Sequence, residues 1–229
     1  MRPKNSLGKR KARSDSDFKR GRPTRAVNPR ILIVCEGTKT EPRYFYDMLY
    51  LLKVRPKAVI IEPNNGSCPD RVVTHAFQLF GADALSGDRF DRVYCVFDRD
   101  KHVKFDDALQ RIKMLNQEAN LNRFFAITST PCFEFWLLLH FGFTSKPFNA
   151  TGKKSACDTV LTDLKTKDGF AGYGKGKSDI CALLESKTDD AIRYAKRLRD
   201  EATLAGQTNP STNVDVLVEE LRRLSPKYT

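Results

Sequence analysis

The sequence lacks the signatures of several common protein classes. No run of about 18 apolar residues occurs in its 229 residues, so we expect no membrane-spanning helix and no membrane partner. The N-terminus is charged and has no apolar central segment, so we expect no secretory signal. The nucleotide-binding pattern GxxxxGK[ST] is also missing, because Gly172 and Gly174 in the glycine-rich stretch 169–178 stand too close together.

Cysteine is sparse and shows no metal-binding pattern. The six cysteines are Cys35, Cys68, Cys95, Cys132, Cys157 and Cys181. No two of them have the CxxC spacing that is typical of a zinc site. Two of them lie inside predicted strands, where a small buried thiol is ordinary. We therefore expect reduced cysteines and a cytoplasmic protein.

Positive charge is abundant but concentrated at one end of the chain. The formal net charge is +12, and residues 1–30 hold eleven Lys/Arg against two Asp. Residues 1–29 have little apolar content, which predicts a disordered basic arm. Such an arm either contacts the phosphate backbone of a nucleic acid or is only a flexible, solubilising terminus, because basic density by itself is not specific.

Strand and helix patterns alternate through residues 30–145. Buried strands are predicted at 31–35, 58–62, 92–97 and 124–128, and helices are predicted near 41–52, 70–82, 105–119 and 133–141. This alternation predicts an α/β fold, with a mainly parallel sheet of about four strands and helices on both faces. Thr40 is expected to cap the first helix with Pro42 at its first position, and Pro131 is expected near the start of the last. Residues 146–229 are predicted to form a mostly helical C-terminal extension packed on this core.

Carboxylates follow two of the predicted strands where each strand ends. Glu36 follows the first strand, and Asp98 and Asp100 follow the third. Ligands of open α/β sheets bind beyond the carboxyl ends of the strands, and clustered carboxylates repel one another unless protons or a cation neutralise them. Their hard oxygen atoms suit Mg²⁺ or Mn²⁺. We predict that these three acids are catalytic and bind metal with Glu41; alternatively, they are ordinary loop acids and Glu41 only complements a helix dipole.

Basic residues near these acids are candidates for neutralising substrate phosphate. They are Lys39, Arg43, Arg99, Lys101, Lys175 and Lys177. The last two belong to the glycine-rich stretch, which is either a mobile connection or a loop that folds back on the site. Glu134 and His140 are accessory candidates within an apolar stretch. Glu134 is otherwise a first-turn helix acid, and His140 is otherwise a buried core histidine.

Four strings of the sequence together resemble the RloB family. They are CEGTKTEPRYF (35–45), VFDRD (96–100), TPCFEFWLLLHF (130–141) and NPSTNVDVLVEEL (209–221). The resemblance covers most of residues 28–224. The Glu-Gly pair after one strand and the Asp-x-Asp after another also resemble the Toprim fold of topoisomerases, bacterial primases and Old-type nucleases.

The Toprim resemblance implies specific roles for the strand-end acids. Glu36 would be a general acid/base or a metal ligand, and Asp98 and Asp100 would hold the divalent metal. Two positions depart from the Old-type pattern: the step from Gly37 to Glu41 is one residue longer, and Arg99 stands where a small residue is usual.

The RloB resemblance implies a place in bacterial restriction and anti-phage loci, often beside an ATPase. The expected function is therefore a metal-dependent nuclease that hydrolyses DNA or RNA, including transfer RNA, as the effector of an anti-phage or abortive-infection system. Two alternatives stay open: a non-catalytic nucleic-acid-binding or regulatory subunit of an ATPase-containing defence complex, and a nucleotidyl transferase. The sequence does not choose between DNA and RNA and does not indicate the oligomeric state.

Overall fold

The computed structural model describes residues 29–64, 68–85, 87, 89–99, 103–118 and 122–228, and they form an α/β fold around one sheet. The strands are β1 (Ile31–Cys35), β2 (Val59–Pro63), β3 (Arg92–Asp98), β4 (Phe124–Thr130) and β5 (Ser211–Thr212). Their order is β2-β1-β3-β4-β5, with β1 to β4 parallel and β5 antiparallel to β4. The predicted parallel sheet is confirmed. The two-residue strand β5 was not predicted, because it is too short to produce a periodic pattern.

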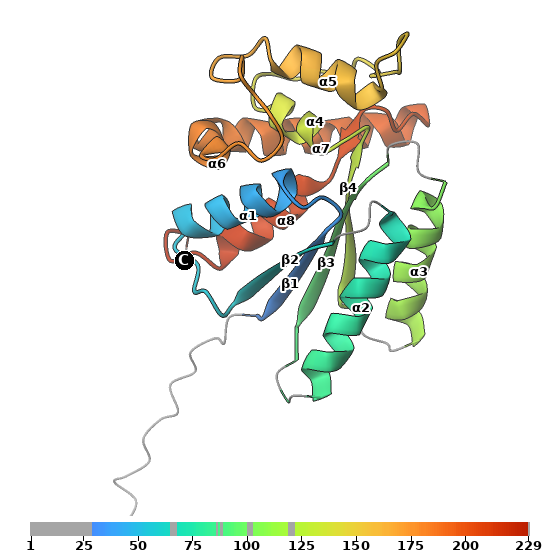
Figure 1. Ribbon diagram of the computed structural model, residues 1–229, viewed down its shortest axis with the longest axis vertical. Helices are drawn as coiled ribbons and strands as arrows, with labels where there is room; N and C mark the ends of the chain where they lie inside the picture. The colour runs from blue at the N-terminus through green and yellow to red at the C-terminus, as the bar shows by residue number, and fades with distance from the viewer. Residues whose placement is uncertain are drawn as a thin grey trace, which may run out of the picture.

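Helices cover both faces of the sheet, as predicted. They are α1 (Thr40–Leu51), α2 (Pro69–Leu85), α3 (Phe105–Glu118), α4 (Glu134–Leu139), α5 (Ala156–Leu164), α6 (Ile180–Leu184), α7 (Thr188–Ala205) and α8 (Val214–Arg223). Figure 1 shows α1 and α8 on one face and α2 and α3 on the other. Within the described residues, no helix has the length and apolar character needed to cross a membrane. The basic arm was predicted for residues 1–29. All of these except residue 29 lie outside the described part of the chain.

The interior strand β1 is buried on both faces, which explains its continuous apolar run. Ile31, Ile33 and Cys35 pack into the core beneath α1 and α8, whereas Leu32 and Val34 pack against α2 and α3. Successive side chains of a strand point to opposite faces, so both faces must be apolar when helices cover both.

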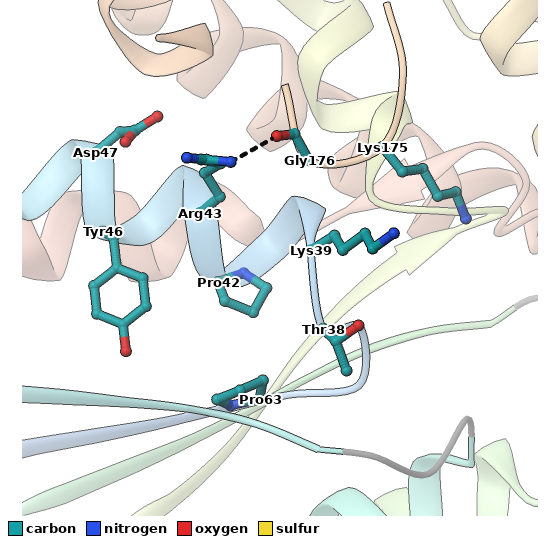
Figure 2. A pocket seen from close by; sticks show the side chains of 9 residues that line it. All are labelled: Thr38, Lys39, Pro42, Arg43, Tyr46, Asp47, Pro63, Lys175 and Gly176. Atoms are coloured by element: carbon teal, nitrogen blue, oxygen red, sulfur yellow. Dashed lines mark hydrogen bonds between the residues drawn. The ribbon is translucent and has the colours of Figure 1, made fainter. Parts of the chain in front are cut away.

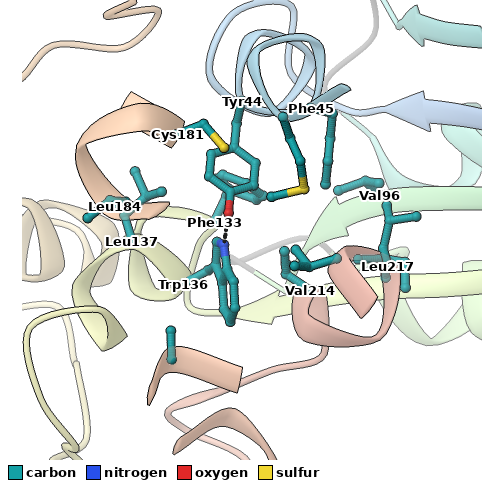
Figure 3. Close-up of a cluster of buried hydrophobic side chains, with 14 of the residues drawn as sticks. Tyr44, Phe45, Val96, Phe133, Trp136, Leu137, Cys181, Leu184, Val214 and Leu217 are labelled. Atoms are coloured by element: carbon teal, nitrogen blue, oxygen red, sulfur yellow. Dashed lines mark hydrogen bonds between the residues drawn. The ribbon is translucent and has the colours of Figure 1, made fainter. Parts of the chain in front are cut away.

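The C-terminal helices contribute to the same core as the sheet. Figure 3 shows Trp136 of α4 in one buried cluster with Tyr44 and Phe45 of α1 and with Val214 and Leu217 of α8. Trp136 is fully buried, and its indole Nε1 donates a hydrogen bond of 2.9 Å to the Tyr44 hydroxyl. Residues 146–228 therefore extend the hydrophobic core of the sheet.

Two local predictions about helix starts were wrong. Thr40 is the first residue of α1, not its cap; Lys39 occupies the N-cap position without a side-chain cap hydrogen bond, and Pro42 is the third helical residue. Proline is tolerated there because first-turn N–H groups have no partner within the helix. Pro131 follows a cis peptide bond and precedes α4, which begins at Glu134. The cis form of an X–Pro bond cannot be read from sequence.

Candidate active site

The carboxyl ends of β1 and β3 meet at the switch point of the sheet. The chain runs from β1 to β2 on one side of β1, and β3 then pairs with the other side of β1. Open α/β sheets bind ligands at such a reversal of strand order. The backbone N–H of Glu36 donates to the Val96 carbonyl at 2.8 Å, which continues the pairing of the two strands. Glu36 Oε2 accepts a hydrogen bond of 3.1 Å from the backbone N–H of Asp98. The structure therefore brings these two predicted acids into direct contact.

Glu41 reaches back from the first turn of α1 and packs on Gly37. A Cβ atom placed on Gly37 would lie 2.2 Å from Glu41 Oε2, so only glycine leaves room for this carboxyl group. Glu41 is only 8% exposed. This carboxyl group therefore lies in the first turn of α1 and is buried beside the loop that carries Glu36.

Glu134 brings a fourth carboxylate from the start of α4. It is 2% exposed, and its Oε1 accepts a hydrogen bond of 3.4 Å from the Tyr173 hydroxyl. The neighbouring backbone N–H of Phe133 donates to the Asp98 carboxylate. The start of α4 therefore contributes both a charge and a hydrogen-bond donor to the switch point.

Burial and mutual repulsion raise the pKa values of two of these acids. The pKa of Asp98 lies well above its usual range, first because of burial and then because of the charges of Glu41, Glu134 and Glu36. Burial is also the main reason why the pKa of Glu41 rises to about 7; the charge of Glu134 adds to the rise, and Lys175 opposes it. Four carboxylates from separate segments thus share one site with excess negative charge, which protons or a cation would relieve.

The donor set fits a hard divalent cation. All four side chains offer carboxylate oxygen, the ligand type that suits Mg²⁺ and Mn²⁺. The described acids Glu36, Glu41 and Asp98 do not form a set of three with ligand atoms all within 4.8 Å of one another. Such an open arrangement is compatible with Mg²⁺, because Mg²⁺ commonly retains several waters and takes one or two carboxylates. The predicted site residues Asp100 and Lys101 lie outside the described residues.

A tighter group of potential metal ligands lies beside Glu134. Cys132, Glu134 and Cys157 place one ligand atom each within 4.8 Å of the others. The two cysteines, however, form a disulfide with their Cα atoms 5.7 Å apart. Disulfide sulfurs are not thiolates, so this state does not provide a thiolate metal site.

The expectation of six reduced cysteines is wrong for Cys132 and Cys157. They are 25 residues apart in the sequence and come together because the segments at the starts of α4 and α5 pack against each other. Nothing in their spacing could have indicated the pairing. The free cysteines are Cys35, Cys68, Cys95 and Cys181.

Three of the predicted phosphate-binding residues line one pocket. Lys39, Arg43 and Lys175 border a cavity of about 620 Å³ beside α1 (Figure 2). The Arg43 guanidinium donates to the Gly176 carbonyl at 3.0 Å and so fixes the glycine-rich loop on α1. Lys177 donates instead to the Gly169 carbonyl of its own loop at 2.7 Å and does not line this pocket. The glycine-rich loop therefore folds back towards α1, which is the alternative in which its lysines approach the site. Of its two lysines, only Lys175 lines the pocket.

Arg99 occupies a second pocket next to Asp98. Its guanidinium lies 5.1 Å from the centre of the Phe105 ring and 3.4 Å from the Thr208 hydroxyl. The pocket has a volume of about 330 Å³ and also includes Pro131. Basic side chains therefore lie in two separate pockets, one reached from the end of β1 and the other from the end of β3.

His140 lies in the hydrophobic core and not among the carboxylates. Its Nδ1 is 3.0 Å from the Trp136 carbonyl, and burial lowers its pKa to about 4. The charges that act on it are those of Lys187 and Arg222. This placement favours the interpretation of His140 as a buried core residue.

Sequence reasoning missed two contributors to the site. They are the hydroxyl of Tyr173 and the backbone N–H of Phe133. Gly37 was part of the Glu-Gly pair in the sequence, but its close contact with Glu41 was not predicted. Neither the Tyr173 hydroxyl nor the Phe133 N–H left a signal in the sequence.

The fold and the site define an α/β protein with a carboxylate cluster at the switch point of its sheet. The chain belongs to the RloB-like protein family, whose model matches residues 31–221. That span contains every described residue of the site. A search of curated proteins found no match. The predicted family membership is thereby confirmed.

Proposed function

We propose that this protein is a metal-dependent nuclease that hydrolyses phosphodiester bonds of DNA or RNA. The observation that carries the proposal is the convergence of Glu36, Asp98, Glu41 and Glu134 at the switch point of the sheet. Here burial, followed by the charges of neighbouring acids, raises the pKa values of Asp98 and Glu41, which favours a site that takes up a cation.

Each side chain has a role that its surroundings support. Glu36 and Asp98 would hold Mg²⁺ or Mn²⁺, with the Phe133 N–H orienting the Asp98 carboxylate. A bound divalent cation would supply charge neutralisation of the phosphate and activation of water. Without a metal ion, burial raises the pKa of Glu41 to about 7, so its carboxyl group is suited to accept or donate a proton near neutral pH.

Basic residues support a nucleic acid as the substrate. Lys39 and Lys175 in one pocket and Arg99 in the other can neutralise phosphates on either side of the scissile one. The role of effector in an anti-phage system, beside an ATPase partner, rests on the resemblance to families found in such loci. The relation to the Toprim fold also rests on resemblance, together with the position of Glu36 and Asp98.

A second candidate function is a non-catalytic nucleic-acid-binding or regulatory subunit. The observation that favours it is that the ligand atoms of Glu36, Glu41 and Asp98 do not all lie within 4.8 Å of one another. In this case the basic residues, including those of the N-terminal segment, would carry the function. Binding would then be strongly salt-dependent, and no cleavage would accompany it.

The test is cleavage of plasmid DNA, single-stranded DNA and bulk transfer RNA with Mg²⁺ or Mn²⁺. Wild type should cleave at least one substrate, and Asp98→Asn and Glu36→Gln should each reduce the rate by about 100-fold or more. Asn can still accept the Phe133 hydrogen bond, so Asp98→Asn removes charge with little change in shape. Asp106→Asn is the matched control, because Asp106 is an exposed first-turn acid of α3 and should not affect the rate.

The outcomes separate the candidate functions. Full cleavage by both Asp98→Asn and Glu36→Gln would refute the assignment of the site. Tight, salt-dependent binding without cleavage by wild type would support the regulatory subunit. Incorporation of labelled nucleotides, lost in the same two variants, would indicate nucleotidyl transfer instead.

A further inference from the structure

The pocket beside α1 has one basic end and one aromatic end. Figure 2 shows the side chains of Lys39 and Lys175 extending to the same side, next to Thr38. The Tyr46 ring lies at the other end, near Pro42 and Pro63. We propose that this pocket binds one unpaired nucleotide of the substrate, with its phosphate at the two lysines and its base stacked on Tyr46.

The size of the pocket suits a nucleotide. Its volume of about 620 Å³ falls within the range of about 300–1,000 Å³ that is usual for small-molecule sites. Proline and tyrosine provide apolar walls, and lysines provide the positive end. This combination matches the general chemistry of single-stranded nucleic-acid sites, in which cations follow the backbone and aromatic rings stack on bases.

Tyr46 is both exposed and held in place. Its side chain is 52% exposed, yet its hydroxyl donates a hydrogen bond of 2.8 Å to the Ile61 carbonyl on β2. A large aromatic ring in water would ordinarily be mobile, and this bond fixes its orientation. A fixed, exposed ring loses little conformational entropy when a base stacks on it.

The basic end of the pocket is the end nearer to the carboxylates. Lys39 follows the loop of Glu36 and Gly37, and the charge of Lys175 acts on Glu41. The loop that carries Lys175 packs closely on α1, since a Cβ on Gly176 would lie 3.3 Å from the Lys39 Cβ. A nucleotide bound in this way therefore directs its phosphate towards the acids, and it is an immediate neighbour of the scissile phosphate.

This geometry selects unpaired nucleotides. In a duplex each base is stacked between its neighbours, so a base can lie on Tyr46 only after it leaves the stack. The inference rests on the proposed nuclease function for the position of the scissile phosphate, but nucleotide binding in the pocket is measurable without cleavage. DNA and RNA share the chemistry involved, and separate arms of the experiment distinguish them.

The experiment measures binding of labelled oligonucleotides to the full chain in EDTA, by fluorescence anisotropy at fixed ionic strength. The probes are oligothymidylate, oligouridylate and a hairpin duplex. Tyr46→Ala should weaken binding of the preferred single strand about 5- to 100-fold, the loss of one stacked base. Tyr46→Phe keeps the stacking ring but loses the hydrogen bond to Ile61, so it should weaken binding much less than Tyr46→Ala does.

Tyr50→Ala is the matched control. Tyr50 is the same residue type one turn further along α1 and is 85% exposed, but it does not line the pocket. Equal binding by Tyr46→Ala and Tyr50→Ala would overturn the proposal, as would wild type that binds the duplex as tightly as the single strands. A strand with 5-iodouracil should also crosslink to Tyr46 in wild type, which tests the site even if Tyr46→Ala does not fold. Crosslinks only outside the pocket would overturn the proposal.

Failure of this inference is distinguishable from failure of the proposed function. If binding depends on Tyr46 but no substrate is cleaved, the proposal of a nucleotide pocket is supported and the proposed nuclease function is refuted. If cleavage depends on Asp98 but Tyr46→Ala does not affect binding, the proposed nuclease function is supported and the nucleotide pocket is refuted.

Discussion

Glu41→Gln should change how stability depends on pH. The pKa of Glu41 rises from 4.5 to about 7 in the folded protein, mainly because its carboxyl group is buried. A carboxyl group with a raised folded pKa binds its proton more tightly in the folded than in the unfolded state. Its contribution is therefore fully favourable below about pH 4.5 and is lost as the pH rises to about 7. The difference between the two pKa values corresponds to roughly 3 kcal/mol of unfolding free energy.

Urea unfolding of the metal-free protein measures this effect directly. Trp136 is the single tryptophan and is fully buried, so its fluorescence reports global unfolding. Wild type should lose roughly 3 kcal/mol or more between about pH 4.5 and 7.5, because Asp98 shifts in the same direction. Glutamine carries no charge at any of these pH values. Glu41→Gln should therefore lose the Glu41 part of this pH dependence, keep the part that comes from Asp98, and exceed wild type in stability near pH 7.5.

Glu118→Gln provides the matched control, since Glu118 is an exposed acid at the end of α3 and should follow wild type. Magnesium should restore stability to wild type near pH 7.5, because binding to the ionised acids favours the folded state. If Glu41→Gln kept the full pH dependence of wild type, Glu41 would not be a buried, repelled carboxylate, and this description of the site's electrostatics would be refuted.

Two further predictions follow from close contacts near the site. Gly37→Ala should displace the Glu41 carboxyl group, since the new Cβ would lie 2.2 Å from Glu41 Oε2. The pH dependence of stability in urea should then become weaker, as in Glu41→Gln. A pH dependence equal to that of wild type would contradict the contact. Peptide mapping without reductant should recover Cys132 and Cys157 as one linked peptide pair, and Cys132→Ser should lower stability by roughly 3 kcal/mol through loss of the closed loop. Separate alkylation of both thiols before reduction would refute the disulfide.

The sheet and its acidic edge could be predicted from local patterns. The apolar runs 31–35 and 93–97 are continuous because helices cover both faces of β1 and β3. Parallel neighbours end at the same edge, so Glu36 and Asp98 had to lie close together once the strands were adjacent. The pattern thus predicted where the candidate site lies.

The finer structure of the site depends on contacts between distant segments. Tyr46 joins Pro63 in one pocket because α1 packs beside β2, and Lys175 joins them because Arg43 binds its loop. No periodic pattern encodes such contacts. Glu134 likewise reaches the acids only because the short helix α4 folds back over the end of the sheet.

The measurement that tests the central claim most directly is titration of the metal-free protein with Mn²⁺ by calorimetry. The site at the ends of β1 and β3 should give saturable binding in wild type and in Asp106→Asn, the exposed control on α3. Binding should be lost or greatly weakened in Glu36→Gln and in Asp98→Asn, because each removes the charge of one of the two strand-end carboxylates; the Glu36 carboxylate accepts a hydrogen bond from the backbone N–H of Asp98. Equal Mn²⁺ binding by all four proteins would contradict the claim that these acids form a divalent-cation site.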